Sequence, residues 1–143
     1  MFLEKKIMEK VEVKETYYEE AMRYIHNAKE ELRKAGKDGL YYKDPKYVKA
    51  ASGIAYAGVE KAAKWFLRLH NIKVSIKNVN QIKEGLSGVN NKALSLFNSA
   101  YATLHIAIYY QDERRIDIVK SAFQAAEEFI AYLKPYKKEK VVY

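Results

Sequence analysis

The chain has 143 residues, the length of a single domain and enough to bury a hydrophobic core without disulfides. It contains no cysteine, which excludes a disulfide framework and thiolate chemistry. The formal net charge is +8, and residues 41–100 carry +7 of it, with 10 basic and 3 acidic residues. This excess favours an anionic partner, RNA included, although a lysine-rich surface that serves only solubility is an equal alternative.

Membrane and metal classes are also disfavoured. No apolar run is long enough to cross a bilayer, and residues 1–6 are charged early, without the apolar segment of a signal peptide. We therefore expect a cytoplasmic protein that does not enter a membrane. The histidines His26, His70 and His105 stand far apart without partner ligands at metal-site spacing, so we expect no metal and no cofactor.

The first half of the chain predicts two long helices. Residues 2–15 are weakly amphipathic and fit a helical lead-in or a frayed arm. From Thr16 the apolar spacing predicts a helix that Gly36 ends. Asp44-Pro45 is a start signal, because an N-cap residue precedes proline at the first helical position.

The helix that starts at Asp44-Pro45 is predicted to run to about His70. Apolar residues cover most of its circumference, which predicts a central position with several neighbours. Gly53 and Gly58 each lower helix stability by about 1 kcal/mol relative to alanine. Close packing of another helix, or a contact with a second subunit, would explain their presence.

The second half predicts a short helix and two long ones. Residues 71–91 are irregular, with Gly85 and Gly88 as breaks and a short helix near 79–86. A long helix follows from Asn90 or Asn91 to about Tyr110, and the last helix runs from about 112–114 until Pro135 stops it. Residues 136–143 are then a basic tail, and no stretch alternates like a strand.

These elements predict one all-α domain over residues 1–143, an antiparallel up-and-down bundle of four long helices plus a short capping helix. The helix of residues 91–110 is the one that combines core and chemistry. Its apolar seam consists of Leu94, Phe97, Tyr101, Leu104 and Ile108. An adjoining polar stripe consists of Asn98, Tyr101, His105, Tyr109 and Asp112.

Three roles are open to His105 on this stripe. It is a buried imidazole bonded to a tyrosine hydroxyl or a backbone carbonyl, which is the favoured reading, or it contacts a ligand, or it is catalytic. On the preceding long helix, Lys61, Lys64 and Arg68 are neighbours one turn apart. They form either a solvated face or a phosphate-binding face.

Most enzyme motifs are missing from the sequence. There is no glycine-rich phosphate loop, no G-x-S-x-G elbow and no Glu-x-x-His pattern of the di-iron bundles. Paired carboxylates occur only as neighbours on faces that we expect to be solvated.

The stretch from Lys46 to Arg68 is alanine-rich and ends in Glu-Lys-Ala-Ala-Lys before bulky apolar residues. It resembles the second helix of HEPN domains, the "higher eukaryotes and prokaryotes nucleotide-binding" bundles. Residues 100–110 resemble a later HEPN helix, and their Leu-His-x-x-x-Tyr-Tyr stretch is similar to small uncharacterised bacterial HEPN-like proteins. The resemblance covers about residues 16–134.

The resemblance implies a dimer and raises the question of ribonuclease activity. Many HEPN domains are metal-independent ribonucleases, in which an Arg-x4–6-His motif from each subunit meets the scissile phosphate. The matching histidine is His105, but Asn98, Ser99 and Ala100 occupy the positions where the arginine belongs. The motif is therefore absent, and Arg114 and Arg115 of the next helix are the remaining candidates.

We therefore expect a non-catalytic, HEPN-like homodimer that binds RNA, a nucleotide or a partner protein. The alternatives are a protein-interaction or accessory module of the antitoxin type, and a divergent metal-independent ribonuclease that uses His105 with Arg114 or Arg115. The homodimer also follows from the apolar faces of the helices at 44–70 and 91–110, which exceed what four helices bury. The candidate ligand-binding residues are Asn98, Tyr101, His105, Tyr109, Lys61, Lys64, Arg68, Arg114 and Arg115, and the catalytic candidate is His105.

Overall fold

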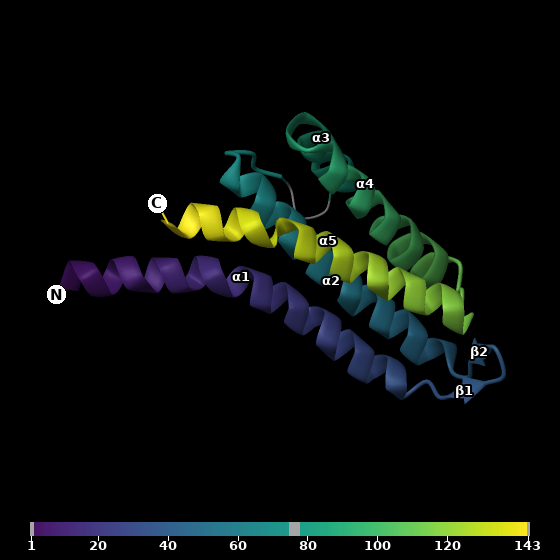
Figure 1. Ribbon diagram of the computed structural model, residues 1–143. Coiled ribbons are helices and arrows are strands. Elements are labelled where there is room, and N and C mark those ends of the chain that lie inside the picture. Colours follow the sequence, from purple (N-terminus) through teal and green to yellow (C-terminus); the bar gives the residue numbers. More distant parts are fainter. Residues whose placement is uncertain (1, 75–77, 143) are drawn as a thin grey trace.

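The computed structural model describes the backbone of residues 2–74 and 78–142 and the side chains of residues 18–74 and 78–134. Its elements are α1 (Phe2–Arg33), β1 (Lys37–Asp38), β2 (Tyr41–Tyr42), α2 (Pro45–Leu69), α3 (Val79–Val89), α4 (Asn91–Ala100), η1 (Tyr101–Tyr110) and α5 (Ile116–Val142). The long helices alternate in direction in the order α1, α2, α4 with η1, and α5, while α3 sits at one end (Figure 1). This confirms the predicted all-α, up-and-down bundle.

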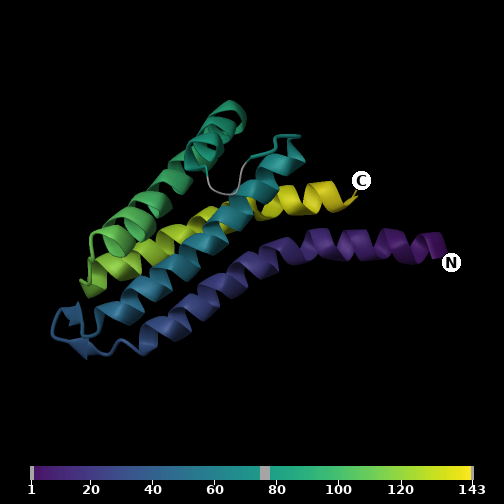
Figure 2. The ribbon, with the colours of Figure 1, turned by 180° about the vertical axis from the view of Figure 1, so that it is seen from behind.

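Helix α1 includes the segment predicted as a lead-in. Its N-terminal part extends past the end of α2, so both chain termini lie at the same end of the molecule (Figure 2). The helix ends at Arg33, and Gly36 follows with φ +67°, a conformation that glycine adopts without steric strain. The predicted stop at Gly36 is therefore confirmed to within the usual uncertainty of a helix end.

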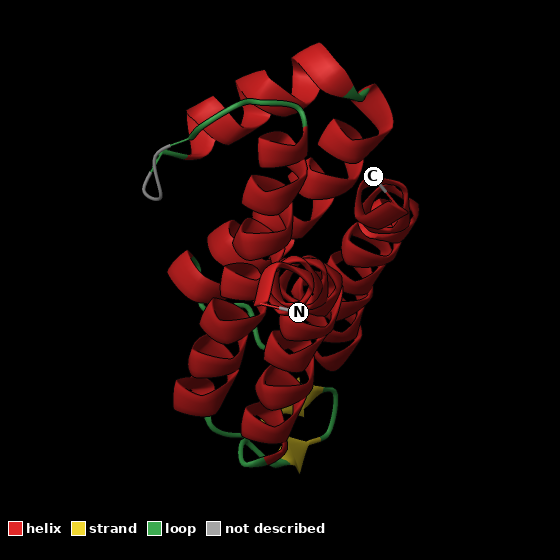
Figure 3. Ribbon diagram, turned by 90° about the vertical axis from the view of Figure 1, so that its left-hand side faces the viewer, coloured by secondary structure: helices red, strands yellow, loops and turns green. Residues whose placement is uncertain are grey.

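A small hairpin connects α1 to α2 and was not predicted. Lys37 pairs with Tyr42 and Asp38 with Tyr41, leaving a two-residue loop that begins at Gly39 with φ +62°. The start of α5 completes the hairpin, since Ile116 N–H donates to the carbonyl of Leu40 at 2.9 Å. Strands of two residues are too short to show alternation, so sequence periodicity cannot detect them (Figure 3).

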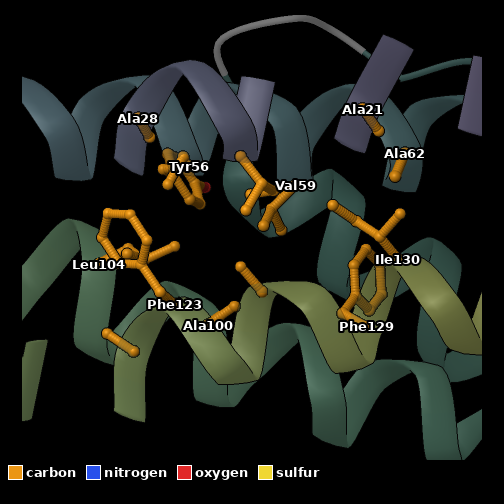
Figure 4. Packing of buried hydrophobic residues seen from close by; sticks show 14 of the residues in the cluster. Ala21, Ala28, Tyr56, Val59, Ala62, Ala100, Leu104, Phe123, Phe129 and Ile130 are labelled. Carbon is orange, nitrogen blue, oxygen red and sulfur yellow. The ribbon is translucent and has the colours of Figure 1, made fainter. Parts of the chain in front are cut away.

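Helix α2 is the centre of the bundle, as predicted, and packs against α1, α5 and η1. Asp44 caps its N-terminus, accepting a hydrogen bond from Lys46 N–H at 3.0 Å. Figure 4 shows the side chains of Val59 and Ala62 in the core between α1 and α5. The wide apolar surface of α2 is thus covered within one chain, so a second subunit is not needed to bury it.

The glycines of α2 and α3 are contact points between helices. A Cβ on Gly58 would lie 2.8 Å from the Cβ of Tyr24 and 3.0 Å from the carbonyl oxygen of Ala21, so this glycine lets α1 approach α2 closely. Gly85 and Gly88 lie inside α3 rather than breaking the chain, which corrects the prediction. The predicted short helix is confirmed and is longer than expected, Val79–Val89: Asn78 caps its first turn at the predicted start, and the helix continues past Gly85 and Gly88 to Val89.

The predicted helix of residues 91–110 changes type in its middle. Asn91–Ala100 is α-helical, whereas Tyr101–Tyr110 is a π-helix, and Gln111 N–H closes its last turn on the carbonyl of Ile106 at 3.0 Å. The Thr103 hydroxyl donates to the carbonyls of Ser99 at 2.8 Å and Ala100 at 3.3 Å. A hydroxyl that engages these carbonyls competes with the backbone ladder, which gives the transition a local cause.

Helix α5 continues through Pro135 to Val142, so the predicted stop and the non-helical tail are wrong. Proline removes one backbone donor and crowds the carbonyl four residues earlier. That carbonyl belongs to Ala131, an exposed residue, so solvent can replace the lost bond. Over residues 2–74 and 78–142, none of the helices combines the length and apolarity required to cross a bilayer.

Candidate functional site

A pocket of about 490 Å³ opens between α2 and η1, at the edge of α3. Aromatic rings form most of its wall, together with one carboxylate and one imidazole. The lining residues are Gly53, Tyr56, Glu60, Val79, Tyr101, His105, Tyr109 and Tyr110. A concave, largely aromatic site with few polar groups is the usual form of a small-molecule or base-binding pocket.

The rings of Tyr101, His105 and Tyr109, which we call the ring ladder, stack along η1. The centroids of Tyr101 and His105 are 5.4 Å apart at 29°, and those of His105 and Tyr109 are 5.8 Å apart at 11°. Side chains four residues apart lie on the same face of a helix, so the three rings follow one another along the π-helix η1. Such helices are rare and recur at functional sites.

Helix α2 supplies the opposite wall through three residues on one face, Gly53, Tyr56 and Glu60. The Tyr56 ring stacks on His105 with centroids 4.7 Å apart at 25°. A Cβ on Gly53 would lie 3.5 Å from the Tyr109 ring, in ordinary van der Waals contact, so α2 and this end of the ladder are near neighbours. The two elements therefore hold the ring ladder from both sides.

Two lysines lie over the outer rings of the ladder. The Nζ atom of Lys49 is 5.1 Å from the centroid of Tyr109, and that of Lys83 is 4.4 Å from the centroid of Tyr101. Lysine over an aromatic face is attracted by the ring quadrupole. The ladder thus has a positive charge at each end.

Burial shifts the ionisation of the groups in and beside the pocket. Desolvation lowers the pKa of His105, which favours the neutral imidazole. Desolvation raises the pKa of Glu60, while the charge of Lys64 opposes that rise. The pKa of Lys64 is itself lowered by desolvation, against the effect of Glu60. Burial raises the pKa of Tyr56 far above its usual value, so its hydroxyl stays protonated.

The polar stripe predicted on residues 98–112 is partly realised. Tyr101, His105 and Tyr109 come together as predicted and line the pocket. Asn98 does not line it, and its buried amide oxygen accepts no hydrogen bond from the described residues. The imidazole of His105 is half-buried and makes no hydrogen bond with a described residue. The favoured interpretation of His105 as a hydrogen-bonded core histidine therefore does not hold within the described residues.

The predicted basic face lies next to the pocket rather than in it. The ammonium of Lys61 is 3.7 Å from Glu20 and lies over the Tyr24 ring, so it points towards α1. Lys64 stands between Lys61 and Arg68 and feels the charge of both. None of the three basic side chains lines the pocket.

The arginines considered as partners of His105 have other roles. The Arg114 guanidinium donates to the carbonyl of Lys43 at 3.2 Å, which ties the start of α5 to the hairpin. Arg115 pairs with Asp117 at 3.2 Å. No arginine lines the pocket. His105 therefore has no arginine beside it in the pocket, whereas the ribonuclease alternative requires one.

Several residues of the pocket escaped the sequence analysis. Tyr56 and Glu60 could have been found, because with Gly53 they share one stripe of α2 at spacings of three and four. Lys49 and Lys83 had no such signal, since they meet the ladder only through the packing of α2 and α3 around η1. Among the described residues, no three histidine or acidic side chains come together as a metal site would require.

Comparisons with known proteins place the chain in a family. The family described as a domain of unknown function (DUF5618) matches residues 16–135, a range that includes every residue of the pocket. Among solved structures, a protein of unknown function from Dyadobacter fermentans is similar, with a TM-score of 0.76 and 35% sequence identity over 86% of this chain and 97% of that chain. No curated protein matches.

Proposed function

Because the chain belongs to the family described as a domain of unknown function (DUF5618), whose description assigns no activity, we propose its function from the pocket: it binds single-stranded RNA or a nucleotide. The aromatic wall of the pocket, which includes the exposed ring of Tyr110 beside the ring ladder, provides surface on which a base stacks, and Lys49 and Lys83 lie where phosphates would be attracted. Aromatic stacking combined with basic side chains is how proteins hold single-stranded nucleic acid. The observation that carries the proposal is this ladder with a lysine at each end.

The charge of the chain supports an anionic ligand. Residues 41–100, which contribute Tyr56, Lys49 and Lys83, hold +7 of the net charge of +8. Attraction to phosphate accounts for much of the affinity in protein–RNA complexes. It weakens with added salt because binding releases condensed counterions, and their release is less favourable at a higher salt concentration. A salt-dependent association is therefore the first measurable consequence.

The test is fluorescence anisotropy of a short labelled RNA at several salt concentrations. Lys49→Gln with Lys83→Gln removes two phosphate contacts and should reduce the salt slope by about 1.4, from about 0.7 per contact. The matched control changes two exposed lysines outside the pocket, Lys92→Gln with Lys120→Gln, and should leave the slope unchanged. Equal slopes in the two double variants would contradict the assignment of Lys49 and Lys83.

Stacking is tested separately from charge. Tyr109→Ala removes one end of the ladder without changing a charge, so it should lower affinity by about 5- to 150-fold and leave the salt slope unaltered. The predicted triad Lys61, Lys64 and Arg68 stays a proposal for the outer phosphates. Since Lys61 already contacts Glu20, changing the triad to glutamine should have a smaller effect on affinity than changing Lys49 and Lys83.

The HEPN relationship is also part of the proposal. It is supported by the helical bundle and by the position of His105 on the helix that resembles a HEPN element. Superposition on solved HEPN dimers tests it, because His105 should fall on their conserved catalytic position. The broken Arg-x4–6-His motif predicts no ribonuclease activity above that of His105→Ala, and cleavage that this variant abolishes would favour the divergent enzyme.

A second candidate function is association through the hairpin, either as a homodimer or with a partner protein. Leu40 is 70% exposed and Tyr41 48% exposed, and they are adjacent at the hairpin. An exposed apolar pair of this kind is a contact site for another chain. Light scattering should give twice the chain mass of 16.6 kDa for the homodimer and the single mass for Leu40→Lys. A monomeric wild-type protein would exclude the homodimer.

A further inference from the structure

Glu60 is the one acidic residue in the lining of the pocket. It lies one turn after Tyr56 on α2, and its side chain is partly buried. Within residues 18–74 and 78–134, no hydrogen-bond donor engages its carboxylate, and Lys64 acts on it through charge. Its carboxylate oxygens, which line the pocket, are thus available to accept hydrogen bonds from a ligand.

The chemistry of a carboxylate selects among flat ligands. Its two oxygens accept two parallel N–H bonds from a group that presents adjacent donors. On the Watson–Crick edge, guanine offers N1–H beside its 2-amino group. Adenine and cytosine each place an acceptor nitrogen next to the amino group, and uracil flanks its single N–H with carbonyls. A carboxylate in this position would therefore repel part of the edge of every base except guanine.

A cationic ligand is the competing chemistry for rings around a carboxylate. Tyr110 meets His105 at 86° and Tyr109 at 84°, an arrangement that could also surround an alkylammonium group. The charges outside the rings oppose this, since Lys49 and Lys83 lie over the ladder and Lys64 is next to Glu60. The surroundings favour a ligand with a negative portion as well as N–H donors.

We propose that Glu60 makes the pocket selective for guanine, accepting hydrogen bonds from N1–H and the 2-amino group of a base held at the ring ladder. This rests on the proposed function, in which the pocket binds a nucleotide or single-stranded RNA. The phosphate of the guanine nucleotide then faces the lysines, while Glu60 reads the edge of the base. Bidentate recognition of a base edge discriminates by about 5- to 150-fold against the wrong base.

The experiment measures binding of GMP, IMP, AMP, CMP and UMP to the full chain by isothermal titration calorimetry. The wild-type protein should bind GMP about 5- to 150-fold more tightly than AMP, CMP and UMP. The affinity for IMP should lie between those for GMP and AMP, because IMP keeps N1–H and lacks the 2-amino group. Glu60→Gln should weaken GMP binding and abolish the preference. The matched control Glu84→Gln makes the same charge change at an exposed residue outside the pocket and should preserve it.

The outcomes separate the two proposals. Equal affinity of the wild-type protein for the five nucleotides would refute guanine selection and leave nucleotide binding intact. Retained preference in Glu60→Gln would assign selection to another group. Absence of binding to all five nucleotides and to RNA would refute both proposals, and binding of tetramethylammonium in their place would identify a cation pocket. The IMP comparison needs no variant, so the proposal stays testable if Glu60→Gln does not fold.

Discussion

Replacement of Gly58 by alanine tests how closely α1 packs on α2. The new Cβ would lie 2.8 Å from the Cβ of Tyr24, whereas carbon atoms in favourable contact are about 3.5–4.0 Å apart. It would also lie 3.0 Å from the carbonyl oxygen of Ala21. Neither the Cβ of Tyr24 nor the carbonyl oxygen of Ala21 can move by side-chain rotation. Helices α1 and α2 must therefore separate by a large fraction of an ångström at this point.

The net effect follows from two opposing contributions. Overpacking of a filled core costs about 1–3 kcal/mol, and alanine gains about 1 kcal/mol over glycine inside a helix. We expect Gly58→Ala to lower the free energy of unfolding by up to about 2 kcal/mol. For a chain of this length, 1 kcal/mol corresponds to about 3 °C in Tm, so the midpoint should fall by up to about 6 °C.

Two other glycines of the bundle give matched controls for this substitution. A Cβ on Gly88 meets nothing within 4 Å, so Gly88→Ala should raise Tm by about 2–3 °C through helix propensity. A Cβ on Gly85 meets the methyl groups of Leu67 at 2.9 and 3.1 Å, which rotate away more easily than backbone, so its effect should lie between the other two. Thermal unfolding followed by far-UV circular dichroism measures all three, with urea unfolding as the equilibrium check. If Gly58→Ala unfolded above the wild-type temperature, as we expect of Gly88→Ala, the close approach of α1 would be refuted.

Two further predictions concern a helix cap and an imidazole. Asn90→Ala should lower the free energy of unfolding by about 2 kcal/mol in urea, because Oδ1 of Asn90 accepts from Ala93 N–H at 3.0 Å and from the Tyr132 hydroxyl at 3.1 Å. Asp44→Ala, which loses one cap bond, should cost about 1 kcal/mol, and equal losses would show that the Tyr132 bond contributes nothing. Burial lowers the pKa of His105 below its unfolded value of about 6.5. Near and below pH 6.5 the unfolded chain therefore binds more protons than the folded chain. The folded protein loses stability as the pH falls through this range. His105→Phe should therefore lose less stability than the wild-type protein between about pH 7.5 and pH 5, as Tm measured across that range will show.

Local signals in the sequence were sufficient for most of the secondary structure. Asp44-Pro45 and Gly36 mark helix ends through backbone geometry that depends on one or two residues. The helical spacing of Tyr101, His105 and Tyr109 placed these residues on one stripe, because residues four apart are neighbours on any helix. Pro135 misled the same reasoning, because α5 continues through this proline, and the carbonyl that loses its partner belongs to the exposed residue Ala131.

The composition of the pocket was decided by tertiary packing. Glu60 and Tyr56 face the ladder because α2 lies against η1 with a particular rotation, and Lys83 reaches Tyr101 because α3 folds back over the same end. That rotation depends on close contacts such as the one at Gly58, where the surfaces of α1 and α2 meet. Hydrophobic periodicity shows which face of a helix is buried but not which residues lie across from it. The sequence alone therefore determined the bundle and one wall of the site, and only the packed helices determined the other.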